Sequence, residues 1–270
     1  MNPTSLLGPD IERRFGGLRR LHGDAGYLRL RAARIAVVGL GGVGSWAVEA
    51  LARSGVAALT LIDMDHVAES NINRQVQALG ATLGMAKAQA LAERIADIHP
   101  GCEVHCVEAF VEPGNWPALL EAPVDVVIDA CDQVGAKLAL AQWARSTESP
   151  LVLVGAAGGK LLPQAVRVAD LAHVTHDPLL AALRRRLRKS HAAPLTGDLG
   201  LTAVYSCESV QRPESGDGVD GSLNCHGYGS SVNVTATFGM VAASEALRLL
   251  LAPGTAPEPA PTRAAQRGNL

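Results

Sequence analysis

The stretch Arg34-Ile-Ala-Val-Val-Gly39-Leu-Gly41-Gly42-Val-Gly44 joins a short β-branched run to a set of closely spaced glycines. The apolar run predicts a buried strand, and the helical spacing over 43–54, which Gly55 ends, predicts a helix directly after the glycines. Glycines at such a junction let the backbone approach an anion closely, and the free N–H groups of the helix start can bind it. The pattern therefore predicts a nucleotide-binding loop made of Gly39, Gly41, Gly42 and Gly44.

Asp63 supports this interpretation because it ends the next predicted strand, over 59–62. A carboxylate at that position can accept hydrogen bonds from the ribose hydroxyls of a nucleotide. The alternative is a glycine turn that serves only close packing of the helix on the strand.

Outward from this loop, strands and helices alternate. Further strands are expected over 104–107, 124–128 and 151–154, and helices over 86–98 and 137–145. This alternation predicts an α/β fold with a doubly wound, Rossmann-like and mostly parallel sheet. The first 30 residues are basic and are expected to be irregular.

The second half of the chain breaks this rhythm. A strand is expected over 163–168, a helix over 177–189, loops over 192–229 and a closing helix over 232–251. The Pro/Ala-rich residues 253–270 are expected to be a disordered tail. We therefore expect a single domain over 1–252, with a nucleotide-binding core over about 30–160 and a substrate-facing part over about 161–252.

Composition narrows the function classes. The 270 residues are 48% hydrophobic, and 24 basic against 26 acidic side chains give a net charge of −2, which excludes a wholly basic nucleic-acid coat but not a local basic patch. The five cysteines include no Cys-x-x-Cys pair, so no zinc ligand set is visible.

The absence of an apolar N-terminal core predicts no signal peptide and a cytoplasmic protein. Glu245 and Arg248 within 232–251 favour a buried helix at a subunit interface over a membrane span.

The polar residues after Asp63 point to a triphosphate rather than to a nicotinamide cofactor. Asn71-Ile-Asn73-Arg74-Gln75 follows Asp65, and Lys87 comes soon after. Cations neutralise the charge that accumulates on a leaving pyrophosphate, whereas a dinucleotide needs no such additions. Asp132, beyond the strand end at Asp129, is suited to hold Mg²⁺ against the same phosphates. The alternative for Arg74 and Lys87 is a solvated surface pair.

These motifs, together with Asp129-Ala-Cys-Asp132, resemble in order and spacing the adenylation core of the ubiquitin-activating (E1-like) superfamily. The flanking motifs Arg14-Phe-Gly-Gly17, Asp177-Pro178-Leu179 and Val234-Thr-Ala-Thr-Phe-Gly239 resemble one branch, the tRNA threonylcarbamoyladenosine dehydratases. The resemblance implies the E1-like adenylation fold and an enzyme that uses ATP and Mg²⁺. It would adenylate the threonine carboxylate of N6-threonylcarbamoyladenosine at position 37 of tRNA, and ring closure would then expel AMP.

The resemblance also implies roles for single residues and partners. Arg74, Lys87 and Asp132 would be catalytic, and Arg14 or Arg13 would replace the trans-acting arginine that the sulfur-carrier activators have where this chain has Gly17. The nucleotide would contact the loop glycines, Asp63, Asp65, Asn71, Arg74, Gln75 and Lys87. A homodimer, tRNA carrying the modified adenosine, and a functional link to a sulfur-transfer (cysteine desulfurase) system are the implied partners.

Two features of the second half have competing explanations. The cluster Arg184, Arg185, Arg186, Arg188 and Lys189 is either a patch that contacts tRNA phosphates or a solvated helix end. Cys225 is either a nucleophile that forms a thioester with the activated substrate or, like His226, a residue that lines the substrate site. The second role is favoured, because a carboxylate with its own intramolecular nucleophile does not require a thioester. Cys131 is expected to be a small apolar filler.

Three other functions remain open from the sequence. The first is ATP-dependent adenylation of a ubiquitin-like sulfur-carrier protein, the second an NAD-dependent oxidoreductase and the third a non-catalytic nucleotide-sensing scaffold. The missing Cys-x-x-Cys pairs and Gly17 count against a ubiquitin-like protein substrate.

Overall fold

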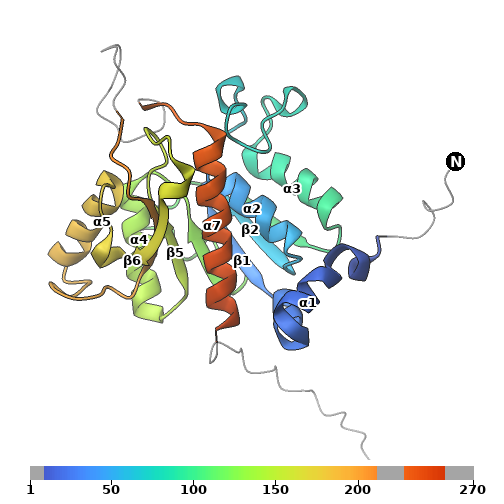
Figure 1. The fold of residues 1–270 in the computed structure, drawn as a ribbon, viewed down its shortest axis with the longest axis horizontal. Coiled ribbons are helices and arrows are strands. Elements are labelled where there is room, and N and C mark those ends of the chain that lie inside the picture. The colour runs from blue at the N-terminus through green and yellow to red at the C-terminus, as the bar shows by residue number, and fades with distance from the viewer. Residues whose placement is uncertain (1–8, 212–227, 253–270) are drawn as a thin grey trace, which may run out of the picture.

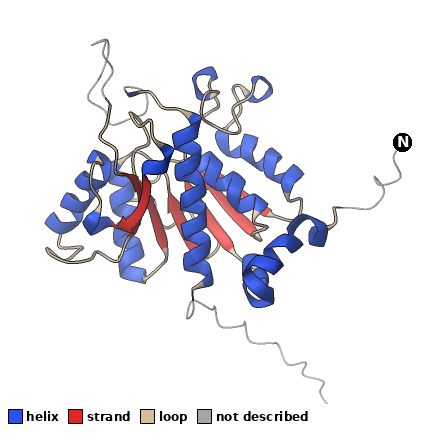
Figure 2. Cartoon of the chain, in the orientation of Figure 1, coloured by secondary structure: helices blue, strands red, loops and turns tan. Residues whose placement is uncertain are grey.

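A seven-stranded sheet with helices on both faces forms the centre of the molecule (Figures 1 and 2). The computed structural model describes residues 9–211 and 228–252, so the predicted tail and the candidates Cys225 and His226 lie outside the described residues. The strand order is β3-β2-β1-β4-β5-β7-β6, and all neighbours are parallel except β6 and β7. The strands are β1 (Arg34–Val38), β2 (Ala58–Ile62), β3 (Glu103–Val107), β4 (Val126–Asp129), β5 (Leu151–Val154), β6 (Val166–Asp170) and β7 (Thr202–Ser206).

The predicted α/β class with a doubly wound, mostly parallel sheet is confirmed. The helices are α1 (Ile11–Leu30), α2 (Gly44–Arg53), α3 (Lys87–Ile98), α4 (Val134–Thr147), α5 (Pro178–Lys189) and α7 (Val232–Leu251). One apolar layer joins the sheet to α2, α3 and α7, and a second joins its other face to α4 and α5. Residues of β1, β2, β4 and β5 are buried on both faces, which explains why their sequences are continuous apolar runs.

The expectation of an irregular N-terminal region is wrong, because residues 11–30 form α1. Asp10 caps the start of the helix, since its side chain accepts a hydrogen bond from the N–H of Arg13, and the helix is interrupted at Gly23 (φ 71°). Phe15, Tyr27 and Leu30 are buried, while the many charged side chains between them mask the apolar spacing.

The expectation of loops throughout 192–229 is wrong at 202–206, because β7 lies there and inserts between β5 and β6, and the part over 212–227 lies outside the described residues. β7 is a short run surrounded by glycine, serine and aspartate, so its signal is local and weak. The strand expected over 163–168 begins later, because Pro163–Ala165 forms a 3₁₀ turn before β6.

The closing helix α7 agrees with its prediction from end to end. It packs against α2 and crosses β4 and β5, with Phe238, Ala242 and Ala246 fully buried. By length and composition alone it is the one helix among the described residues that could cross a membrane. These buried side chains give it the contacts of a core helix.

Candidate active site

A cavity of about 170 Å³ opens at the carboxyl ends of β1, β2 and β4, where parallel sheets of this kind bind ligands. Because β1 lies between β2 and β4, the segments that follow these three strands meet at one edge of the sheet. The structure thereby brings most of the predicted nucleotide residues to one cavity. They are Gly39, Gly41, Gly42, Asp63, Asp65, Arg74, Gln75, Lys87 and Asp132.

Asp63 holds the glycine loop in place. Its Oδ2 accepts a hydrogen bond from the N–H of Leu40 at 2.6 Å, and its Oδ1 accepts one from the N–H of Asp65 at 2.8 Å. The carboxylate therefore fixes the loop and the strand exit of β2 together. Its place in the cavity wall leaves it able to meet a ribose as well.

Gly44 and Asn71 are not part of the cavity lining. A Cβ on Gly44 would collide with the carbonyl oxygen of Gly39, so this position needs glycine for close helix–strand packing. Asn71 is buried and its Oδ1 accepts a hydrogen bond from the N–H of Ala68. For these two residues the structure shows packing and turn formation rather than a position against a ligand.

Lys87 and Arg74 place two cations at the cavity. The Lys87 side chain is 8% exposed, and its Nζ lies 2.7 Å from Oδ2 of the exposed Asp65. Nη1 of Arg74 donates to the carbonyl oxygen of Ser70 at 2.8 Å, while its Nε is buried without an acceptor among the described residues. Arg74 is half-buried and Lys87 is buried. This excludes the alternative that the two residues are a solvated surface pair.

Asp132 is the exposed carboxylate at the end of this cavity, beyond β4. Within 9–211 and 228–252 no group of three or more metal-ligating side chains is present. Mg²⁺ usually takes one or two carboxylates and completes its shell with phosphates and water, so a single free carboxylate fits it. Asp129 is not available for this purpose, because it is fully buried against Lys137.

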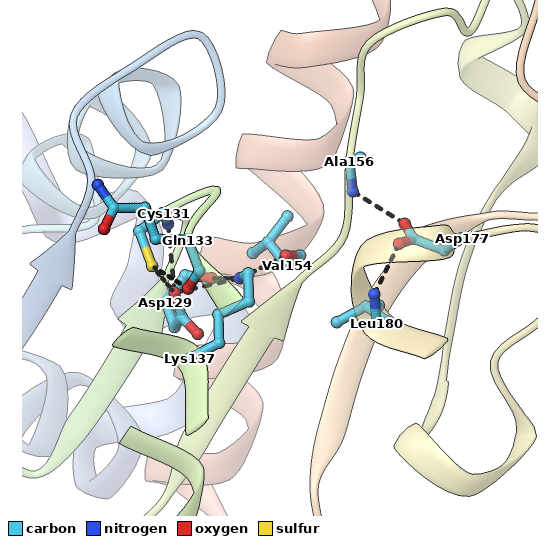
Figure 3. A network of polar contacts seen from close by, with 8 residues as sticks. All are labelled: Asp129, Cys131, Gln133, Lys137, Val154, Ala156, Asp177 and Leu180. Atoms are coloured by element: carbon cyan, nitrogen blue, oxygen red, sulfur yellow. Dashed lines mark hydrogen bonds and ion pairs between the residues drawn. The ribbon is translucent and has the colours of Figure 1, made fainter. Parts of the chain in front are cut away.

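Asp129 and Lys137 form a buried ion pair that sequence reasoning missed (Figure 3). Nζ of Lys137 lies 3.1 Å from Oδ1 of Asp129 and donates to the carbonyl oxygens of Asp129 and Val154. Burial opposes the charge on Lys137, but the Asp129 carboxylate outweighs it, so the pKa of Lys137 is raised. The pair joins the ends of β4 and β5 beneath the cavity.

Cys131 belongs to the same network. Burial, followed by the nearby Asp129 carboxylate, raises its pKa well above the ordinary value. The side chain is therefore a neutral thiol that donates to Oδ1 of Asp129 at 2.9 Å. This agrees with the expectation of a small filler rather than a nucleophile.

Arg14 lies away from this cavity. Its Nη1 donates to the carbonyl oxygens of Asp97 and Ile98 at the C-terminal end of α3. Within one chain the structure does not bring this arginine to the nucleotide residues, and its contacts are those of a helix C-terminal cap.

The basic cluster on α5 divides into two sets. Arg185, Arg186 and Lys189 are exposed. Nη1 of Arg184 instead donates to the carbonyl oxygens of Leu171, Ala172 and Val174, and Arg188 is half-buried. Three of the five cations are therefore free to meet an external phosphate, and Arg184 serves the fold.

Comparison with known proteins agrees with this architecture. The chain matches the ThiF family over residues 13–267. It is 44% identical to tRNA threonylcarbamoyladenosine dehydratase of Escherichia coli over 89% of this chain and 94% of the relative, and 40% identical to that of Haemophilus influenzae over 90% and 95%.

A solved structure gives the same result. The crystal structure of the Escherichia coli enzyme in complex with ATP superimposes with a TM-score of 0.81 at 44% identity, covering 89% of this chain and 94% of that one. The E1-like fold expected from the motifs is therefore confirmed. The chain belongs to the ThiF family, within its branch of tRNA threonylcarbamoyladenosine dehydratases.

Proposed function

We propose that this chain is an ATP-dependent tRNA N6-threonylcarbamoyladenosine dehydratase. The observation that carries the proposal is the single cavity that gathers the glycine loop, Arg74, Lys87 and Asp132. A relative 44% identical to the chain was crystallised with ATP, and another structure of that protein with AMP. An enzyme that transfers adenylate uses the first molecule and releases the second.

In the proposed reaction a carboxylate oxygen of the substrate threonine attacks the α-phosphorus of ATP. The bond from phosphorus to the pyrophosphate breaks, and Lys87 and Arg74 neutralise the charge that develops on the leaving group. An atom of the carbamoyl group then attacks the activated acyl carbon, and AMP and a proton leave. The net change is loss of one water, and ring closure within one molecule needs no covalent enzyme intermediate.

Three residues of the cavity take specific roles in this proposal. Asp63 positions the glycine loop and meets the ribose, Gln75 lies beside the loop, and Asp132 would hold Mg²⁺. Bound there, the metal would neutralise phosphate charge. Arg14 retains a place in the site only if a second chain supplies it, which the proposed homodimer would allow.

The remaining partners are proposed on less direct support. A groove between α1 and α7, lined by Leu21, Met240 and Leu247, offers exposed apolar surface for a homodimer. The basic patch of Arg185, Arg186 and Lys189 supports contact with tRNA phosphates. The cytoplasmic location rests on the sequence composition, and the link to sulfur transfer rests on the family resemblance.

Isotope exchange between labelled pyrophosphate and ATP tests the proposal. Exchange or AMP release that depends on tRNA carrying N6-threonylcarbamoyladenosine is the expected result. Dependence on a protein with a diglycine tail would instead identify a sulfur-carrier activator. Binding of NADH without any exchange would identify a nucleotide-binding protein of another class.

A further inference from the structure

A second cavity, of about 530 Å³, lies on the far side of the segment that follows β5. It is bounded by the start of α5, the segment 174–177, and the residues Ser209, Val210 and Tyr228. Ala156 lines both this cavity and the first cavity, which is called the nucleotide cavity from here on. Ala156 is therefore part of a wall that the two cavities share.

Asp177 fixes that wall (Figure 3). Its Oδ2 accepts a hydrogen bond from the N–H of Ala156 at 2.8 Å, and its Oδ1 accepts one from the N–H of Leu180 at 2.9 Å. The same carboxylate therefore caps α5 and anchors the segment after β5. Burial raises the pKa of Asp177, and the two N–H donors oppose that effect.

Lys160 fixes the two edges of the cavity to each other. The side chain is 2% exposed, and its Nζ donates to the carbonyl oxygens of His176, at 3.0 Å, and of Glu208. His176 lines the cavity itself, and Glu208 precedes the lining residue Ser209. Lys160 therefore links two segments of the cavity lining through buried hydrogen bonds.

The lining combines apolar walls with flat rings and a few polar groups. Val174, Pro178 and Val210 supply the apolar surface, and His176 and Tyr228 supply the rings. The hydroxyls belong to Thr175 and Ser209. Unstacked bases are bound by such surfaces, because they stack on rings while their edges form hydrogen bonds.

The position of the cavity fits an RNA base more closely than a free small molecule. α5 begins beside it at Pro178 and carries the exposed Arg185 and Arg186 further along. At 1.5 Å per residue these arginines lie about 11 Å along the helix axis from Pro178, so the helix leads from the cavity to cations that can meet backbone phosphates.

On the basis of the function proposed above, we propose that this second cavity holds the modified adenine base, flipped out of the tRNA anticodon loop. The base would lie between the rings of His176 and Tyr228, and its threonyl group would pass Ala156 so that the carboxylate reaches the nucleotide cavity. Enzymes that act on a base in folded nucleic acid commonly remove it from the stack into such a pocket.

Filling the cavity tests the assignment. Ala181, on α5, is one of the residues that line the cavity. Ala181→Trp places a ring in the space, and Ala181→Ser, which leaves it open, is the matched control. With tRNA carrying N6-threonylcarbamoyladenosine, Ala181→Trp should raise KM at least about 30-fold while the ATP Kd stays within about twofold. Ala181→Ser should leave both constants near those of the unmodified chain.

A second pair of variants keeps the test decisive if Ala181→Trp disturbs folding. Tyr228→Ala should raise KM for the modified tRNA about 10-fold through loss of one stacking ring, and Tyr228→Phe should restore it. A merely structural role of Tyr228 would change the melting temperature and the ATP Kd as well.

The outcomes separate this inference from the function on which it rests. If the unmodified chain does not convert modified tRNA, the proposed function and the cavity assignment both fail. If it converts the tRNA but the cavity-filling and Tyr228→Ala variants keep its KM, only the cavity assignment is overturned. Calorimetry that finds two ATP per chain, falling to one in Ala181→Trp, would assign the cavity to a second nucleotide and would also overturn it.

Discussion

The two cavities on either side of Ala156 use charged residues in opposite ways. In the nucleotide cavity, Lys87 pairs with an exposed carboxylate. Arg74 donates through Nη1 to the carbonyl of Ser70, but its buried Nε has no acceptor within the part of the chain that the structure describes. Around the second cavity, Lys160 and Arg184 donate to backbone carbonyls. A carbonyl cannot move aside as the exposed Asp65 side chain can. Lys87 and Arg74 are therefore available to a ligand, whereas Lys160 and Arg184 stabilise the fold.

Lys137 tests this distinction most severely, because it lies beneath the nucleotide cavity but has the contacts of a structural cation. Lys137→Met leaves the fully buried Asp129 carboxylate without its partner and should reduce the free energy of unfolding by about 3–5 kcal/mol. Urea unfolding followed by circular dichroism measures this loss. The double variant Lys137→Met/Asp129→Leu should lose less, and a loss below about 1 kcal/mol in the single variant would contradict the assignment.

Lys87 should show the opposite behaviour. Lys87→Ala should lower turnover at least about 100-fold, because the proposed charged donor to the triphosphate is removed, while the free energy of unfolding changes by less than about 1 kcal/mol. Steady-state AMP release and urea unfolding provide the two readings. The matched variant Lys160→Met should destabilise the fold and keep the ATP Kd within about threefold. If the two lysines exchanged these phenotypes, the distinction would be wrong.

Asp132 extends the comparison to carboxylates, since it is exposed whereas Asp129 and Asp177 are buried. Asp132→Asn should raise the Mg²⁺ concentration for half-maximal activity about 10-fold, because the anionic ligand proposed for the metal is lost. A titration of activity against Mg²⁺ measures this value. An unchanged midpoint would remove Asp132 from the metal site.

The patch on α5 separates free from structural cations within one helix. Replacing Arg185, Arg186 and Lys189 by Gln should reduce the slope of log K for tRNA against log salt by up to about two to three units. Binding measured between low and moderate salt gives the slope, and ATP binding should not change. Arg184→Gln should instead reduce the free energy of unfolding by about 1–2 kcal/mol, since its carbonyl contacts are lost. An unaltered slope would mean that the patch is a solvated helix end.

Glu49 and Asp177 are two carboxylates that should make the free energy of unfolding depend on pH in opposite directions. Burial raises the pKa of Glu49, but hydrogen bonds from Arg94 and Arg53 outweigh it, so the folded-state pKa is below the ordinary 4.5. The unfolded chain then binds more protons in that range, and stability is lost as the pH falls below about 4.5. Glu49→Gln should therefore make the free energy of unfolding depend less on pH at acid pH. Urea unfolding between roughly pH 3 and pH 6 spans this range and measures the change. Asp177, whose pKa is raised, contributes with the opposite sign.

The first half of the fold could be predicted from sequence because each buried strand is a continuous apolar run that ends in Asp or Gly, such as 151–154 before Gly155. The spacing rules for helices and parallel strands then leave few arrangements. The elements α1 and β7 were missed for different reasons. Charged residues mask the apolar positions of α1, and β7 is stable only through pairing with β5 and β6, which no local pattern shows.

The site divides in the same way. The glycine loop, Lys87 and Asp132 follow strand ends, so topology brings them together. The structural use of Gly44, Asn71 and Arg184 could not be predicted, because it depends on contacts with Gly39, Ala68 and Leu171 in the folded chain. Lys137 lies within α4 and Asp177 directly before α5, so no local pattern shows that they contact the ends of β4 and β5.

The contact between Gly155 and Asp177 has a consequence for how the sequence of this protein can drift. A Cβ at position 155 would overlap Oδ2 of Asp177, so an alanine there is incompatible with the aspartate in its present rotamer. Replacement of Asp177 alone would remove the acceptor that holds the N–H of Ala156, and a larger residue at position 155 alone would displace the same carboxylate. Each single substitution therefore disturbs the wall that the two cavities share, and the two positions are expected to change together.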